Sequence, residues 1–154
     1  MGAIVILNLG VIDKPYAENA ADPHLVEMTS EVATKLERNY GIMQFFYNEH
    51  EQFIANALEE SFADALQNAL LGGPRAQDGA IFNQACANIE TRFKQFLSNQ
   101  EMDRKIGGVP TEASLLGISS RFKDRRNKKK KRGPRPSFID TGLYQSSFKA
   151  WVEA

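Results

Sequence analysis

The chain has 154 residues, of which 42% are hydrophobic and 25% charged, so a single domain of this length can bury a core without disulfide or metal support. Nineteen basic and nineteen acidic side chains cancel to a formal charge of zero, and the single cysteine, Cys86, excludes an intrachain disulfide. The two histidines show no metal-site or catalytic spacing, and no stretch is apolar for the roughly 20 residues that a transmembrane helix needs, so we expect neither a cofactor nor a membrane partner.

The segment from Ala3 to Ile12 is strongly apolar and predicts a β-strand, or two short strands broken at Gly10. Its two faces would carry Val5, Leu7 and Leu9 on one side and Ile4 and Ile6 on the other. Because both faces are apolar, we expect the strand to be buried or to pair with a neighbouring subunit. The segment lacks the basic leader and the cleavage site of a secretory signal, so we expect synthesis in the cytoplasm.

Two helical patterns follow. In the first, Asp22 is the expected N-cap and Pro23 the first helical residue. Its apolar positions are Leu25, Met28, Val32, Leu36 and Tyr40. Gly41 is a candidate interruption before a longer pattern over residues 42–71, which would be about 45 Å long if unbroken. The apolar positions of that pattern are Phe46, Phe53 or Ile54, Ala57 or Leu58, Phe62, Ala65 or Leu66, and Ala69 or Leu70. Gly72-Gly73-Pro74 is expected to end it.

A third helix is expected to begin with Asp78 as its cap. Its apolar face would consist of Ile81, Phe82, Ala85, Cys86, Ile89, Phe93, Phe96 and Leu97. We interpret the phenylalanine stripes of these helices as core or helix–helix contacts, and Cys86 as a small buried residue. The stretch from Gly107 to Pro110 is expected to be a linker, and Thr111 to cap a short helix that ends near Gly117.

From Ser119 to Pro136 the sequence is highly charged and has no periodicity, which predicts a long loop. The basic residues of this tract are Arg121, Lys123, Arg125, Arg126, Lys128, Lys129, Lys130, Lys131, Arg132 and Arg135. Three interpretations stay open: a solvated loop, a contact with a polyanion such as DNA through counterion release, and docking onto an acidic face of a neighbouring subunit. Phe122 is the only aromatic residue of the tract, so recognition by base stacking is poorly supported.

The segment from Arg132 to Glu153 carries the most informative pattern of the chain. Pro134 and Pro136 favour an extended approach to the apolar pair Phe138-Ile139. Asp140-Thr141-Gly142 then predicts a turn or a helix start, because Asp and Thr side chains accept from backbone N–H groups and glycine tolerates positive φ. The last stretch alternates as a short strand would, at Phe148, Ala150 and Val152.

The block Pro-x-Phe-Ile-Asp-Thr-Gly-Leu-Tyr-x-x-Ser, residues 136–147, resembles the signature of bacteriophage neck and tail-completion proteins. In that family a basic, proline-bearing segment leads into a hydrophobic-Asp-Thr-Gly-x-Leu-x-x-Ser motif, and the proteins form rings at the head–tail junction. The resemblance covers roughly the last twenty to thirty-five residues. It implies a structural protein of the virion neck, a head–tail connector or a tail-completion or terminator protein, that joins the portal to the tail around the DNA channel.

The same resemblance implies partners and residue roles. The ring would contain six copies, or twelve on the portal side, and would contact other neck, portal or tail proteins at the head–tail junction of a particle assembled in the host cytoplasm. Asp140 would cap a corner of the fold together with Thr141, and Gly142 would provide the turn. Leu143 and Phe148 would anchor the segment in the core. The basic tract would line the lumen, where DNA passes, or clasp the next subunit.

Little in the sequence suggests an enzyme. It contains no phosphate-binding or dinucleotide-binding glycine loop, no zinc spacing and no nucleophile elbow. Glu59 and Glu60 are adjacent on a helix and diverge by about 100°, so they cannot share a site. Aspartic proteases also use Asp-Thr-Gly, but that chemistry needs a second aspartate, which here only a symmetric dimer could provide. The alternative function is non-sequence-specific nucleic-acid binding through the tract from Arg121 to Arg135.

We therefore predict a single α+β domain over residues 1–154. Two or three long amphipathic helices would pack on a small sheet formed by the N-terminal strand and the segment from Phe148 to Val152, with a long basic loop. Residues 1–105 hold eight basic and fifteen acidic side chains, a formal charge of −7, and residues 106–154 hold eleven and four, a formal charge of +7. Such opposite halves favour head-to-tail stacking of copies, or bridging of two oppositely charged partners.

Overall fold

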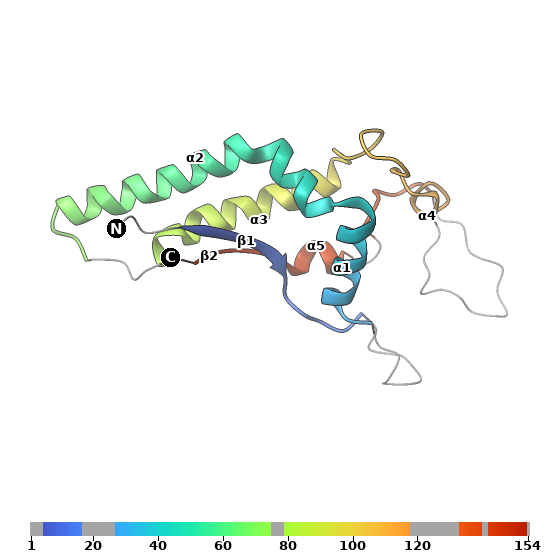
Figure 1. Ribbon diagram of the computed structural model, residues 1–154, viewed down its shortest axis with the longest axis horizontal. Helices are drawn as coiled ribbons and strands as arrows, with labels where there is room; N and C mark the ends of the chain where they lie inside the picture. Colours follow the sequence, from blue (N-terminus) through green and yellow to red (C-terminus); the bar gives the residue numbers. More distant parts are fainter. Residues whose placement is uncertain (1–4, 17–26, 75–78, 118–132, 140–141, 154) are drawn as a thin grey trace.

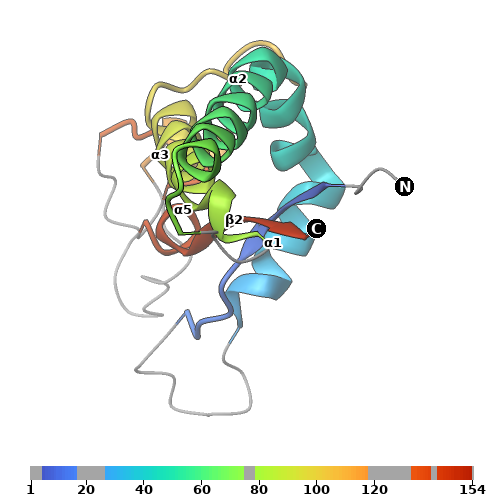
Figure 2. The same cartoon turned by 90° about the vertical axis from the view of Figure 1, so that its left-hand side faces the viewer.

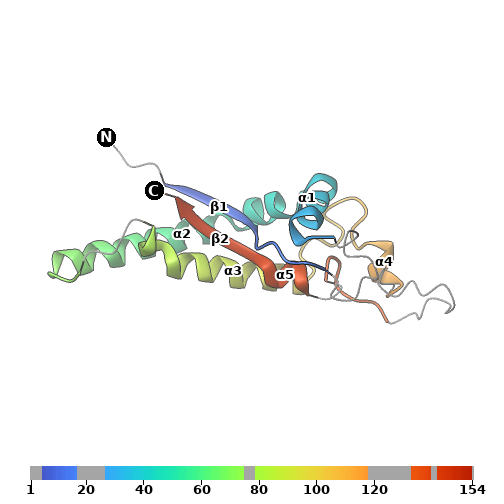
Figure 3. The same cartoon turned by 90° about the horizontal axis from the view of Figure 1, so that it is seen from below.

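The computed structural model describes residues 5–16, 27–74, 79–117, 133–139 and 142–153. Within these ranges the fold is α+β, as predicted, and two long helices lie on one face of a two-stranded antiparallel sheet (Figures 1 and 3). In chain order the elements are β1 (Ile6–Val11), α1 (Thr29–Tyr40), α2 (Ile42–Leu70), α3 (Asn83–Ser98), α4 (Glu112–Leu115), α5 (Leu143–Ser147) and β2 (Phe148–Glu153). Most of the predicted basic loop lies outside the described residues.

The sheet joins the two segments that the sequence predicts to pair. β1 and β2 run antiparallel, with a register that extends from Ile6 opposite Glu153 to Val11 opposite Phe148. Gly10 does not break the strand, since it pairs with Lys149 within the ladder. The absence of a side chain at Gly10 leaves space for the indole ring of Trp151. A Cβ atom at position 10 would come within 3.0 Å of Cη2 of that ring. Side chains alternate along each strand, so one face of the sheet packs on the core. Figure 2, seen from one end of α2, shows the two long helices on the same side of the sheet.

The first helix starts later than predicted. Met28 has an extended backbone (φ −92°, ψ 155°), and α1 begins at Thr29, so the prediction of one helix that starts after Asp22 and runs through Met28 is wrong. Residues distant in sequence fix the start of this helix. Asp13 accepts a hydrogen bond from the Ser30 N–H at 3.0 Å, and the Thr29 hydroxyl donates to the Ile12 carbonyl at 2.7 Å. Residues 17–26 lie outside the described ranges.

Gly41 separates α1 from α2, as the sequence suggests. Its φ of 59° is in the left-handed region, where glycine carries no Cβ penalty. The Glu37 carboxylate then accepts from the N–H groups of Met43 and Gln44, at 2.7 and 3.1 Å, and caps the start of α2. The long helix is not straight, because His50 has non-helical angles (φ −121°, ψ 16°), and the bend is visible in Figure 1.

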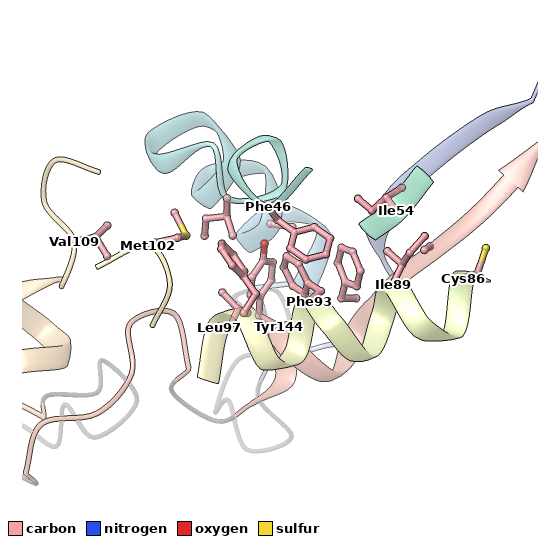
Figure 4. Packing of buried hydrophobic residues seen from close by; sticks show 14 of the residues in the cluster. Phe46, Ile54, Cys86, Ile89, Phe93, Leu97, Met102, Val109 and Tyr144 are labelled. Carbon is pink, nitrogen blue, oxygen red and sulfur yellow. The ribbon is translucent and has the colours of Figure 1, made fainter. Parts of the chain in front are cut away.

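The core is built from phenylalanines of three elements. Phe46 of α2, Phe93 and Phe96 of α3, and Phe148 of β2 are fully buried. The rings of Phe93 and Phe148 are stacked, with centroids 3.7 Å apart and planes at 12°, and Phe46 meets Phe93 edge-on at 5.1 Å. Figure 4 shows this cluster between the helices, with Cys86 at its end, buried as predicted. The sheet is therefore fixed to α3 through aromatic contacts.

The connections differ in detail from the sequence pattern. Residues 75–78 lie outside the described ranges, and a 3₁₀ turn over Ala80–Phe82 precedes α3. Thr111 caps α4 as predicted, because its hydroxyl oxygen accepts from the Ser114 N–H at 3.2 Å. The expected linker around Gly107 has no regular structure, but Val109 is only 5% exposed and packs into the core, so this stretch is anchored rather than free.

Candidate functional site

The proline-bearing approach to the C-terminal motif is fixed on α4. The Arg135 N–H donates to the Ser114 carbonyl at 3.1 Å, and the Thr111 N–H donates to the Ser137 hydroxyl at 3.1 Å. The hydroxyl oxygens of Ser114 and Ser137 lie 3.1 Å apart, and both side chains are nearly inaccessible, at 1% and 4% exposure. These buried hydrogen bonds tie two segments that are distant in the sequence.

The chain then turns at two left-handed positions. Phe138 has a φ of 65°, which is uncommon for a residue other than glycine, and its ring packs edge-on against Tyr40 with centroids 5.0 Å apart. Gly142 has a φ of 74° and immediately precedes α5, so the predicted glycine turn is confirmed. Asp140 and Thr141 lie outside the described residues, and their capping roles stay predictions.

The anchors of the motif are Tyr144 and Phe148. Phe148 is fully buried, as predicted, whereas Leu143 is only half-buried, and the deeper position belongs to Tyr144, which is 2% exposed. Burial raises the pKa of the Tyr144 phenol far above its usual value, because the charged form would lose its hydration. In the motif the leucine stands two residues after the glycine, so its spacing matches Tyr144 rather than Leu143, and the anchor was assigned to the wrong neighbour in a five-residue helix.

The basic tract is almost entirely outside the described residues. Of its ten basic side chains only Arg135 is described, and its guanidinium donates to the Ile139 carbonyl within the same segment. The chain leaves the described structure after Gly117, directly beyond α4, and re-enters it at Gly133, two residues before the contact with α4. Both ends of the tract are thus attached at α4, at the end of the molecule opposite the C-terminus of α2 (Figures 1 and 3).

An exposed apolar surface runs along α2, where the sequence pattern predicted core or helix–helix contacts. An open groove of about 750 Å³ lies between β1 and the first half of α2. Most of the residues that line it are apolar, among them Leu7, Leu9, Tyr47, Ile54 and Leu58. Two acidic residues, Glu37 and Glu51, also line it. Beyond Leu58 the same helix exposes a stripe at intervals of four residues: Phe62, Leu66 and Leu70, which are 56%, 52% and 79% exposed. We call the groove and this stripe the α2–β1 surface.

The two edges of the sheet differ. At the edge of β2 that faces away from β1, Glu90 accepts from the Ala150 N–H at 3.3 Å and from the Lys149 ammonium at 2.9 Å, so α3 caps that edge at Ala150. Ladder bonds alternate along a strand, and the Ile12 N–H donates to the carbonyl of Ser147, the residue directly before β2, at 2.7 Å. The backbone groups of Leu7 and Leu9 therefore point away from β2. No strand pairs with that edge among the residues that the structure describes.

Titratable groups gather at one place in the helical layer. His50 Nε2 lies 3.1 Å from a Glu101 carboxylate oxygen, and Arg92 contacts the other oxygen of Glu101 at 3.3 Å. Burial lowers the pKa of His50, with a further contribution from Arg92, and this disfavours the protonated imidazole. Burial likewise raises the pKa of the Cys86 thiol and favours its unreactive form.

No group of three or more His, Cys, Asp or Glu side chains in the described ranges is arranged to hold a metal ion. No helix in them combines the length and the hydropathy that crossing a membrane would require. No protein-family model matches the chain, and no curated protein or solved structure is significantly similar to it. Its function therefore has to be inferred from its own residues and their arrangement.

Proposed function

We propose that this chain is a structural protein of the tailed-phage neck, a head–tail connector or a tail-completion or terminator protein. In this proposal it forms a ring that joins the capsid portal to the tail and surrounds the DNA channel. The observation that carries the proposal is the C-terminal segment. Its residues resemble the neck-protein motif, and in the fold they dock on α4, turn at Gly142 and end as the core strand β2.

The exposed α2–β1 surface supports assembly. A soluble monomer rarely leaves a long apolar patch open to water, and such a patch usually marks a contact with another protein. In the proposed ring this surface would face a neighbour. Six copies would match the tail side and twelve the portal side, and other neck, portal or tail proteins would bind above and below. The basic tract would line the lumen beside DNA or clasp the next subunit.

Electron microscopy of the purified full-length chain tests this proposal. We expect rings with sixfold or twelvefold symmetry, formed by the chain alone or after mixing with neighbouring neck proteins. A strict monomer in sedimentation over the whole accessible concentration range, with and without those partners, would contradict it. The proposal also requires that Asp140 has no catalytic role, so a peptide library incubated with the protein between acid and neutral pH should stay intact.

A second candidate is a non-sequence-specific nucleic-acid-binding protein. The observation that favours it is the tract from Arg121 to Arg135, which has ten basic residues and one acid. Each phosphate that a basic side chain neutralises releases a counterion, so affinity would fall steeply with salt and would not depend on sequence. A free monomer that retards duplex DNA in a gel at moderate salt would favour this candidate. Rings with little affinity for DNA outside the particle would favour the neck protein.

A further inference from the structure

We propose that the α2–β1 surface binds the basic end of a second copy of this chain. The basic end is α4 together with the tract that leaves it after Gly117 and returns at Gly133. The inference deepens the proposed function and rests on it, because it names the faces through which successive subunits of the ring would meet. Each copy would present one acidic, apolar face and one basic end.

The first step concerns the surface itself. Along α2 the groove wall at Tyr47, Ala55 and Leu58 continues into the exposed stripe at Phe62 and Leu66. Successive positions in this series are three, four or eight residues apart, so they lie on one face of the helix. From Tyr47 to the end of the helix this line is about 35 Å long, at about 1.5 Å per residue. At the far end of this line Phe62, Leu66 and Leu70 are exposed by half or more, which is unusual for large apolar side chains on the surface of a monomer. The surface is therefore built to be covered.

The second step concerns the charge of what covers it. The sequence of α2 contains five acidic residues and no lysine or arginine. Glu49 is neutralised by Lys105 from outside the helix, but Glu51, Glu59, Glu60 and Asp64 are exposed. A partner that covers the apolar stripe must come within reach of these carboxylates, so a basic partner is favoured and an acidic one is disfavoured. Two copies packed α2 against α2 would place like charges opposite each other.

The third step identifies the second copy. Residues 106–154 carry a formal charge of +7 against −7 for residues 1–105, so the chain itself supplies the complementary charge. Figures 1 and 3 place α4 at one end of the molecule and the C-terminal half of α2 at the other. The α4 end therefore lies far from the α2 stripe of the same fold, but it can meet the stripe of a neighbouring copy. Contacts of this head-to-tail kind generate a ring when the rotation closes.

The open edge of β1 adds a recognition element. Leu7 and Leu9 line the groove, their backbone groups point away from β2, and no other strand pairs with them in the described part of the chain. An extended segment laid in the groove could add to this edge by main-chain hydrogen bonds, a common mode of peptide recognition. The sequence of the basic tract shows no helical periodicity, which suits an extended partner better than a helical one.

A pair of matched variants tests the face. In F62E/L66E two exposed apolar side chains of the stripe become acidic, whereas in A63E/Q67E the same charges stand one residue further along, away from the stripe. Because all four positions are exposed, both variants should keep the circular-dichroism spectrum and melting temperature of the wild type. We expect F62E/L66E to weaken self-association in sedimentation at least about thirtyfold, and A63E/Q67E to assemble like the wild type.

A mixing experiment tests the head-to-tail arrangement. A chain with Lys128 to Lys131 changed to Gln keeps its α2–β1 surface but loses much of its basic end, and F62E/L66E has the opposite defect. Neither should assemble alone, yet a mixture has one intact acceptor face and one intact basic end. We expect a one-to-one heterodimer that dissociates as salt is raised from about 0.05 to 0.5 M, since the attraction is electrostatic.

The outcomes separate this inference from the ring proposal. If F62E/L66E forms rings as well as the wild type does, the neck proposal stands and the α2–β1 surface is not the interface. If the mixed variants form no heterodimer while each single defect abolishes rings, the contact is not head-to-tail and the inference is wrong. If the wild-type chain never associates, with or without neck partners, both proposals fall.

Discussion

Truncation of Phe148 to alanine should be one of the most destabilising single changes in this protein. The side chain is fully buried, its ring is stacked on Phe93 at a centroid distance of 3.7 Å, and it lies 6.2 Å from the ring of Phe46. Removal of a buried phenylalanine ring costs its transfer free energy plus the cavity it leaves, about 3–5 kcal/mol. Because the whole stability of such a domain is about 5–15 kcal/mol, a large part of it depends on this position.

Thermal and urea denaturation, followed by circular dichroism, measure the effect. At about 2–4 °C per kcal/mol for a chain of this size, the melting temperature should fall by roughly 6–20 °C. Lys149→Ala is the matched control in the same strand, because it removes a partly exposed ion pair with Glu90 that is worth about 0–1 kcal/mol. If the two variants lost similar stability, the C-terminal segment would not be part of the core, and the structural interpretation of the motif would fail.

Three further predictions follow from local geometry. A Cβ at Gly142 would meet no atom within 4 Å, so Gly142→Ala should cost only the left-handed backbone strain, about 1–2 kcal/mol, with Gly142→Asn milder in urea denaturation. Burial lowers the pKa of His50, so the unfolded chain binds the proton of this imidazole more tightly than the folded chain does. The free energy of unfolding should therefore fall as pH drops below 6.5. Denaturation of His50→Gln at several pH values should show a shallower fall. Asp13→Ala should remove the distant cap of α1 and accelerate hydrogen exchange of the Ser30 amide, whereas an unchanged exchange rate would refute this capping role.

Much of the fold could be predicted from the sequence because its signals are local. Glycines mark the boundaries of α2 on both sides, at Gly41 and Gly72, and both have positive φ. A continuous apolar segment identified the first strand and alternation the second, and their pairing is confirmed. The start of α1 was missed because its cap, Asp13, is separated from the helix by a loop. Periodicity can place a helix, but it cannot show that a remote carboxylate decides where the first turn begins.

The candidate site was harder to predict. The turn at Gly142 and the anchor at Phe148 could be read from residue type and alternation. The interpretation of the α2 stripe as core or helix–helix contact is wrong at Phe62 and Leu66, which no helix covers in the described part of the chain. An apolar face on a helix shows that something should cover it, but only the tertiary arrangement shows where α3 stops covering it.

The pairing of β1 with β2 has a consequence for synthesis. Leu7 lies opposite Val152, so nearly the whole chain must leave the ribosome before this ladder can form. Contacts between residues this far apart in sequence close late and slow the search for the native state. Until then the nascent β1 strand offers two bare edges and an apolar face, a situation that invites wrong pairing. We therefore expect a slow, late folding step that a truncation before Phe148 would abolish, and a nascent chain that depends on protection while its last strand is still being made.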